Sequence, residues 1–208
     1  MSQAAIDEIL ILLKQNQFSK SITELVKEIE VNIDRIPVHK LIVAIGYLYT
    51  KSNNYVLAKH LYEKAIKDMV MDEDSLEYLH LGLAEIEYYQ GSYNESLKHL
   101  KIASNLKTSK AFKPYIYSNQ ALISKQMGDF KSSIKSFNVA LDLAKDNDLY
   151  EIGLYRIRIG MAMSHSMLGN QTAAYHELDQ VDVDYLKENY PFDHCVYYEY
   201  KGHIEFLH

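Results

Sequence analysis

The chain has 208 residues, of which 48% are hydrophobic and 24% charged, a composition typical of soluble globular proteins. Its net charge of −6, from 22 basic and 28 acidic residues, argues against direct binding of nucleic acid through a phosphate-neutralising surface. Eight glycines and three prolines leave few turn signals, so we expect an all-α protein rather than a sandwich or a barrel.

The cysteine usage and the N-terminus indicate a reducing compartment. Cys195 is the single cysteine, so it cannot form an intrachain disulfide or a paired-cysteine zinc site, and we expect it to be a buried structural thiol. Asp7 and Glu8 stand where a signal peptide would be basic. No apolar stretch approaches the roughly 20 residues that a membrane-spanning helix needs. We therefore expect a cytoplasmic protein without a membrane partner.

Helical periodicity predicts a series of helices with short connections. In chain order they cover residues 3–15, 18–31, 36–51, 55–70, 73–90, 93–106, 111–127, 130–146, 148–168, 171–180 and 192–207. The segment from Val181 to Pro191 departs from this rhythm, and Pro191 is expected to stop any helix before it. We expect an interruption of the helical pattern there.

Small residues and their aromatic or aliphatic neighbours recur in a fixed order along these helices. The copies read Gly46, Ala58, Tyr62, Ala65; Ala84, Ser96, Leu100, Ala103; Ala121, Ser133, Phe137, Ala140; and Ala162, Ala174, Leu178, Val181. Their second members, Ala58, Ser96, Ser133 and Ala174, are spaced by 38, 37 and 41 residues. A weaker copy with Phe18, Ser21 and Leu25 precedes them. Nearly the whole chain therefore consists of one repeating unit.

This pattern resembles the tetratricopeptide repeat (TPR) family, whose standard repeat has about 34 residues. The resemblance implies a TPR-like right-handed α-solenoid of antiparallel helix pairs, with the whole chain, 1–208, as a single domain. The repeats would cover about 2–34, 36–72, 73–108, 111–147 and 149–181, followed by a terminal helix at 192–207. Gly46 and Ala58 would let paired helices approach closely. Gly91, Gly128, Gly169 and, at a higher cost, Asn53 would form the turns within the pairs.

The terminal helix has two interpretations. From Tyr200 the sequence resembles the first half of another repeat, so the helix either caps the stack or belongs to a longer repeat protein. It contains many apolar residues: Cys195, Val196, Tyr197, Tyr198, Ile204, Phe206 and Leu207. These favour the longer protein over the cap and predict possible self-association through this helix.

Motifs for catalysis, cofactors and metals are not found in the sequence. The nearest pairs to a metal site are Glu95 with His99 and Glu199 with His203, whereas a transition-metal site normally needs three or four ligands. His194 and Cys195 are adjacent on a helix and point in different directions, and the turn glycines do not form a phosphate loop. We expect no enzyme activity, no cofactor and no metal, and a protein or peptide as partner.

In the TPR architecture the first helix of each pair lines the concave surface, so its residues not used for packing are candidates for partner contact. These are Lys40, Val43, Ala44, Tyr47, Tyr78, Leu81, Glu85, Tyr88, Tyr115, Ser118, Asn119, Leu122, Lys125, Arg156, Ile159, Met163 and Ser166. The peptide-binding set that we select is Tyr47, Tyr78, Glu85, Tyr88, Tyr115, Asn119, Lys125 and Arg156. Tyrosine offers a large contact area at low entropic cost, and an amide or guanidinium can pair with a peptide backbone or a carboxylate. We expect Asn119→Ala and Arg156→Ala to weaken binding without changing the melting temperature.

Two TPR subclasses provide comparisons. Asn119 and Arg156 fall on two places similar to the carboxylate clamp of chaperone-binding TPRs, but Leu81, Glu85 and Gly160 stand where that clamp requires basic or amide residues. The long repeats are similar to those of bacterial peptide-pheromone receptors of the Rap and NprR type, although this chain begins with repeats where those receptors have an effector module. The sequence thus predicts a peptide-binding module of a bacterial intracellular regulator. The alternative is a structural scaffold without a defined peptide groove.

Overall fold

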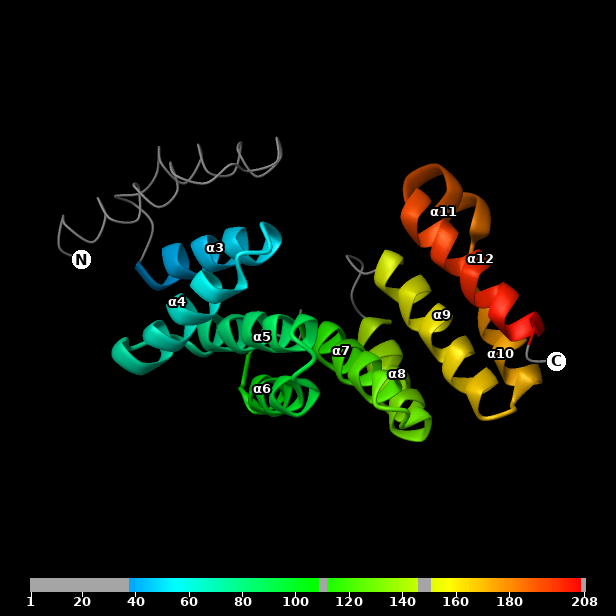
Figure 1. Cartoon of the computed structure of the whole chain (residues 1–208), viewed down its shortest axis with the longest axis horizontal. Coiled ribbons are helices and arrows are strands. Elements are labelled where there is room, and N and C mark those ends of the chain that lie inside the picture. Colours follow the sequence, from blue (N-terminus) through cyan, green and yellow to red (C-terminus); the bar gives the residue numbers. More distant parts are fainter. Residues whose placement is uncertain (1–37, 109–111, 146–150, 207–208) are drawn as a thin grey trace. The chain divides into compact units, whose positions relative to one another are not determined.

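The structure is a computed structural model that describes residues 38–108, 112–145 and 151–206, and all regular elements in these ranges are helices, α3 to α12 (Figure 1). The helices predicted at 3–15 and 18–31, and the repeat at 2–34, lie outside the described residues. The chain divides into two compact units, Met1–Thr108 and Ser109–His208. The single domain over residues 1–208 stays a prediction.

Unit 1 contains two antiparallel helix pairs. Its described helices are α3 (Val38–Lys51), α4 (Tyr55–Asp68), α5 (Glu73–Tyr89) and α6 (Tyr93–Asn105). Helix α3 packs against α4 and α5, and α5 also packs against α4 and α6. The predicted helices end within two residues of these bounds.

Unit 2 continues the pattern and then changes it. Its described helices are α7 (Lys113–Gln126), α8 (Phe130–Ala144), α9 (Glu151–Met167), α10 (Gln171–Leu178), α11 (Val183–Asn189) and α12 (Pro191–Phe206). Helix α9 packs against α7, α8, α10 and α12. Within the part of the chain that the structure describes, no helix combines the length and apolar character that crossing a membrane requires.

The turns inside the four helix pairs have the same backbone conformation. Asn53, Gly91, Gly128 and Gly169 have φ angles of 58°, 75°, 78° and 76°, in the left-handed region that glycine adopts without steric cost. The predicted turns are therefore confirmed, including the one in which an asparagine replaces glycine.

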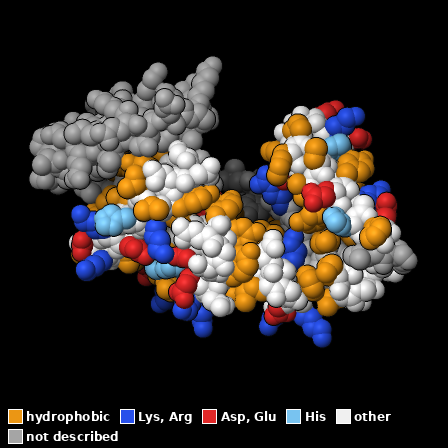
Figure 2. Space-filling view, in the orientation of Figure 1, with side chains coloured by type: hydrophobic (Ala, Val, Ile, Leu, Met, Phe, Trp, Pro, Cys, Tyr) orange, Lys and Arg blue, Asp and Glu red, His pale blue; other side chains and the backbone are white. Residues whose placement is uncertain are grey.

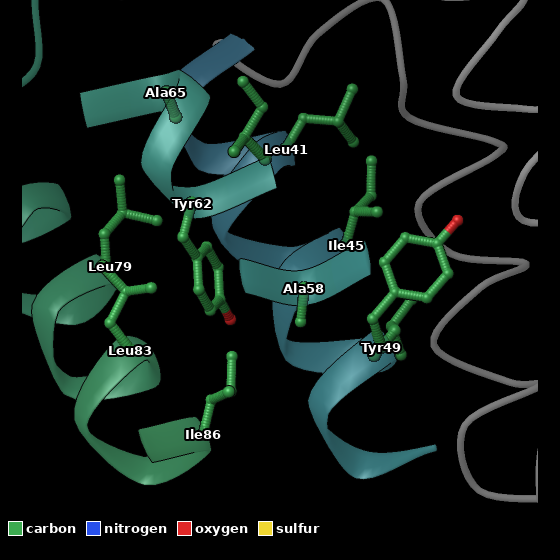
Figure 3. Packing of buried hydrophobic residues seen from close by; sticks show 11 residues of the cluster. Leu41, Ile45, Tyr49, Ala58, Tyr62, Ala65, Leu79, Leu83 and Ile86 are labelled. Carbon is green, nitrogen blue, oxygen red and sulfur yellow. The ribbon is translucent and has the colours of Figure 1, made fainter. Parts of the chain in front are cut away.

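The repeat positions form the core of each unit. The second-helix anchors Ala58, Ser96, Ser133 and Ala174 are fully buried. In unit 1, the ring of Tyr62 projects from α4 toward α5 (Figure 3), and a Cβ added at either Gly46 or Gly82 would fall onto that ring. In unit 2, a Cβ at Gly160 would lie 2.5 Å from Cζ of Phe137. The packing role predicted for Gly46 and Ala58 is confirmed, with Tyr62 as the side chain that fills the space.

Helix α11 lies in the segment that we expected to interrupt the helical pattern, and that prediction was wrong. The Asp182 side chain caps the helix by accepting a hydrogen bond from the Tyr185 backbone N–H at 2.9 Å, and Leu186 is buried beneath it. Pro191 does not only end a helix; it is the first residue of α12, where its missing N–H has no helical partner to lose.

Helix α12 buries one side and exposes the other. Tyr197 and Ile204 are buried in a cluster with residues of α9, α10 and α11. On the other side Phe192 and Phe206 are 77% and 87% exposed. Cys195 is exposed as well, so the expectation of a buried thiol was wrong. The reason is its register: Cys195 is two residues from Tyr197, about 200° around the helix.

Candidate partner-binding surfaces

Three of the predicted site residues lie together on α3 and α5 of unit 1. The rings of Tyr47 and Tyr78 are 6.5 Å apart, and Tyr47 is exposed at the surface. The hydroxyl of Tyr62 hydrogen-bonds with Thr50, and the nearby Glu85 and Tyr47 each raise the pKa of that hydroxyl. Burial is the main reason why the pKa of Tyr62 is raised, so this hydroxyl stays neutral. The result is a surface of two tyrosine rings beside a carboxylate.

Tyr88 belongs to an aromatic cluster that the sequence analysis did not single out. Its ring lies 5.6 Å from that of Tyr89 and 5.8 Å from that of Tyr93. Tyr89 also stacks on Tyr55 at 5.5 Å with an interplanar angle of 15°. The cluster joins α4, α5 and α6 near the turns of both helix pairs. A sequence signal existed, since each of these tyrosines is within three residues of a turn.

In unit 2, Arg156 of α9 forms a bidentate ion pair with Asp193 of α12. Nε donates to Oδ1 at 2.6 Å and Nη2 donates to Oδ2 at 2.8 Å. The arginine side chain is 58% exposed, whereas the aspartate side chain is only 9% exposed. The carboxylate of Asp193 therefore holds the guanidinium in one orientation, while more than half of the arginine side chain remains accessible to solvent. Asp193 is a functional candidate that the sequence analysis missed, because 37 residues separate it from Arg156.

Lys125 of α7 also reaches α12. Its Nζ donates to the Tyr200 hydroxyl at 3.0 Å and lies 4.7 Å from the centroid of the Tyr200 ring. The ammonium thus donates a hydrogen bond to the Tyr200 hydroxyl and also makes a cation–π contact with the Tyr200 ring. Both basic residues selected in this unit are held by residues of the same helix, α12.

The other predicted residues differ in accessibility. Tyr115 and Asn119 are half-buried on α7. Leu81, Ile159 and Ser166, which belonged to the wider set of partner-contact candidates, are buried and serve packing instead. Asn119 stands two residues before the packing residue Ala121. Glycines occupy the same position in α5 and α9, where Gly82 precedes Ala84 and Gly160 precedes Ala162 by two residues. Its role in partner binding stays a prediction.

One of the two Glu–His pairs singled out in the sequence, Glu95 with His99, is not an ion pair in the structure. Glu95 pairs with Lys98 at 2.6 Å rather than with His99. Within the described ranges, no set of three or more His, Cys, Asp or Glu side chains is arranged to hold a metal ion.

Neither a protein-family model nor a curated protein sequence matches the chain. Solved structures do match. The chain is similar to YrrB, a TPR protein with an unusual peptide-binding site, with a TM-score of 0.53 and 16% sequence identity over 88% of this chain and 84% of that one. It is also similar to a mutant of MamA, with a TM-score of 0.52 and 16% identity over 83% of this chain and 91% of that one. These likenesses show a TPR-like fold, as the repeat pattern predicted.

Proposed function

We propose that the chain is a non-enzymatic protein-interaction module that binds an extended peptide or a partner helix. The observation that supports this best is the exposed guanidinium of Arg156, which Asp193 holds in a fixed orientation. A side chain ordered before binding loses less entropy when a partner arrives, so more of the contact energy becomes affinity. A guanidinium pairs with carboxylates and backbone carbonyls, which are the acceptors that a peptide offers.

The two units would make different contacts. In unit 1, Tyr47 and Tyr78 offer apolar ring surface and Glu85 offers an acceptor for N–H groups. In unit 2, Lys125 and Arg156 offer cationic donors. We infer that the partner segment for unit 2 contains acidic side chains. Membership of a bacterial regulator, and the likeness to pheromone receptors, stay predictions.

A phage-displayed library of random peptides, panned against the full chain, tests the proposal. We expect selected peptides enriched in Asp and Glu. Calorimetry with a selected synthetic peptide should show binding weakened by Arg156→Ala or Lys125→Ala, each by about 1–3 kcal/mol, the cost of leaving a polar partner unsatisfied.

Arg158→Ala is the matched control for Arg156→Ala. Arg158 also lies on α9 and also forms an ion pair, with Glu177 at 2.8 Å, but its side chain is mostly buried. The control therefore loses a comparable ion pair without removing an exposed guanidinium. Equal affinity in all three variants and the parent, or peptides without acidic enrichment, would contradict the proposal for unit 2.

Self-association through α12 is the second candidate, and it corresponds to the scaffold alternative. Hydrophobic side chains lie exposed over α11 and α12 (Figure 2), and Phe192 and Phe206 of α12 are among the most exposed aromatic residues described. Between them in the sequence, Gly202 has open space where a Cβ would be, unlike Gly46, Gly82 and Gly160, where a Cβ would meet an aromatic ring. A helix or ring from a second copy could pack there.

Light scattering at increasing protein concentration tests this second candidate. We expect the parent chain to associate and Phe206→Glu to shift it toward the monomer. Val56→Glu is the control, because Val56 is a similarly exposed hydrophobic residue on α4. A parent chain that stays monomeric throughout, or equal dissociation in the control, would exclude α12 as the contact.

A further inference from the structure

Helix α12 has the register of the first helix of a repeat pair. In the described pairs the first helices are α3, α5, α7 and α9, and their small packing residues continue at a spacing of 38, 37, 41 and 40 residues into α12: Gly46, Ala84, Ala121, Ala162 and Gly202. At the same shift of 40 residues, Ile157 of α9 corresponds to Tyr197 of α12, and both are buried. Ser164 and Ile204 correspond in the same way and are buried too. The side of α12 that faces the preceding pair is therefore packed as it is in α9.

The two helices differ on the side that a second helix covers. In α9, Ile159 and Ala162 are buried in a cluster with residues of α10, its second helix. The corresponding residues of α12, Glu199 and Gly202, are exposed, and so is Phe206 one turn further along. The exposed side of α12 is thus the side on which the other first helices bind their second helix.

The second helices share a pair of residues that make this contact. A small residue is followed four residues later by an aromatic residue or leucine: Ala58 with Tyr62, Ser96 with Leu100, Ser133 with Phe137, and Ala174 with Leu178. In unit 1 the ring of Tyr62 fills the space beside Gly46 of the first helix. Gly202 and Phe206 of α12 have the same spacing, and both are exposed. One face of α12 therefore carries the small residue that a second helix covers and also the residue pair that a second helix supplies.

We propose that α12 of a second copy of the chain acts as the second helix for α12, and that each copy completes the other's repeat. In the antiparallel arrangement of a repeat pair, Gly202 faces the partner's Gly202, and each Phe206 ring fills the open space beside the opposite glycine. Two glycines at the crossing let the backbones approach closely enough to bury both rings. One two-fold axis makes both contacts at once, so association closes at a dimer. This inference rests on the second candidate above, self-association through α12, and gives it a geometry and a stoichiometry.

Sedimentation velocity of the full chain over a range of concentrations tests the proposal. We expect the mass to approach twice that of the monomer and to rise no further. Gly202→Leu should weaken the dimer at least tenfold, because the leucine side chain would stand where the partner's Phe206 ring lies. General apolar attraction would instead be strengthened by an added leucine.

The folded monomer should tolerate Gly202→Leu, since a Cβ at this position meets no atom within 4 Å. Circular dichroism at a concentration at which the parent is monomeric checks that the variant folds. His203→Leu is the matched control: His203 is the next residue of α12 and is also exposed, but it lies about 100° around the helix from Gly202. It should leave the dimer unchanged.

Mild oxidation tests the antiparallel arrangement. Cys195 precedes Gly202 by seven residues, so the two Cys195 residues of the dimer would lie about 21 Å apart along the helices, too far for a disulfide. Gly202→Cys combined with Cys195→Ser should form a disulfide across the two-fold axis, whereas the parent should not.

Failure of this geometry can be told from failure of self-association through α12. An unchanged or tighter dimer in Gly202→Leu, species larger than a dimer, a Cys195 disulfide between parent chains, or no disulfide in the Gly202→Cys variant would overturn the inference. If Phe206→Glu still dissociated the parent in those cases, self-association through α12 would stand. A parent that stays monomeric at every concentration would overturn both.

Discussion

The ring of Tyr62 occupies space that side chains would otherwise take at Gly46 and Gly82. Fully buried between α3 and α5, it connects the two pairs of unit 1. The repeat pattern specifies the packing because a large side chain of one helix fills the space beside glycines on the neighbouring helices.

Gly46→Ala should therefore destabilise the chain by about 1–3 kcal/mol, because the new methyl group overlaps the Tyr62 ring. Gly202→Ala is the comparison, since its methyl group would meet no atom within 4 Å and alanine favours a helix by up to about 1 kcal/mol. Urea unfolding measures both changes. Opposite signs are expected, and adding Tyr62→Leu should recover part of the loss in Gly46→Ala. A Gly46→Ala variant as stable as the parent would contradict the packing.

Arg156 has a structural role besides the one proposed in binding. Its ion pair with Asp193 joins α9 to α12, so the sequence-based expectation of an unchanged melting temperature for Arg156→Ala is revised. We expect a loss of about 1 kcal/mol, at the low end because the arginine is more than half exposed. Thermal unfolding of Arg156→Ala, Asp193→Asn and the double variant measures the coupling. Additive effects of the two substitutions would show that the pair does not stabilise the fold.

Helix α11 shows how a short element depends on its ends. With seven residues and one buried leucine, Leu186, it has too few turns for apolar periodicity to reveal it. Its signals were the aspartate before it and the proline after it, which mark a helix N-cap and the N1 position of the next helix. The longer helices were predicted well because each spans several turns of a repeated pattern.

Asp182→Ala should lower the free energy of unfolding by about 1 kcal/mol, within the 0.5–2 kcal/mol range for a lost cap, because the Tyr185 N–H loses its side-chain acceptor. Asp184→Ala is the control: it also removes an aspartate near the start of α11, but Asp184 is exposed and is not the cap. Chemical denaturation measures both. Equal losses in the two variants would point to a general charge effect instead of capping.

At the scale of the whole molecule, the sequence predicted the helices and repeat register but not the contacts between side chains of different helices. Each helix pair needs small residues where its two helices approach closely. Because this need recurs in every pair, the small residues repeat at a fixed spacing that the sequence shows. The partners Asp193, Tyr200 and His99 lie 37, 75 and 19 residues from Arg156, Lys125 and His80. Such pairs follow from how successive helices stack, which no local pattern encodes.

The stability of the whole chain should depend on pH through three half-buried histidines. Burial lowers the pKa of His80 to about 4, and it also lowers the pKa values of His99 and His165 despite nearby carboxylates that oppose it. Near His99 these carboxylates are Glu87, Glu95 and Glu63, with Lys59 acting in the opposite sense; near His165 the carboxylate is Glu177.

The sign of the effect follows from proton binding. Between the ordinary histidine pKa of about 6.5 and the lowered folded values, the unfolded chain binds more protons than the folded chain. The free energy of unfolding is therefore greatest above about pH 6.5 and falls as the pH drops toward 4. We expect a melting temperature that declines through this window, measured by circular dichroism. His80→Asn should flatten the decline, because it removes the group with the largest lowering, whereas His60→Asn should follow the parent. A melting temperature that stays constant from pH 7.5 to pH 5, or an equally steep decline in His80→Asn, would show that partial burial does not keep these rings neutral in the folded chain.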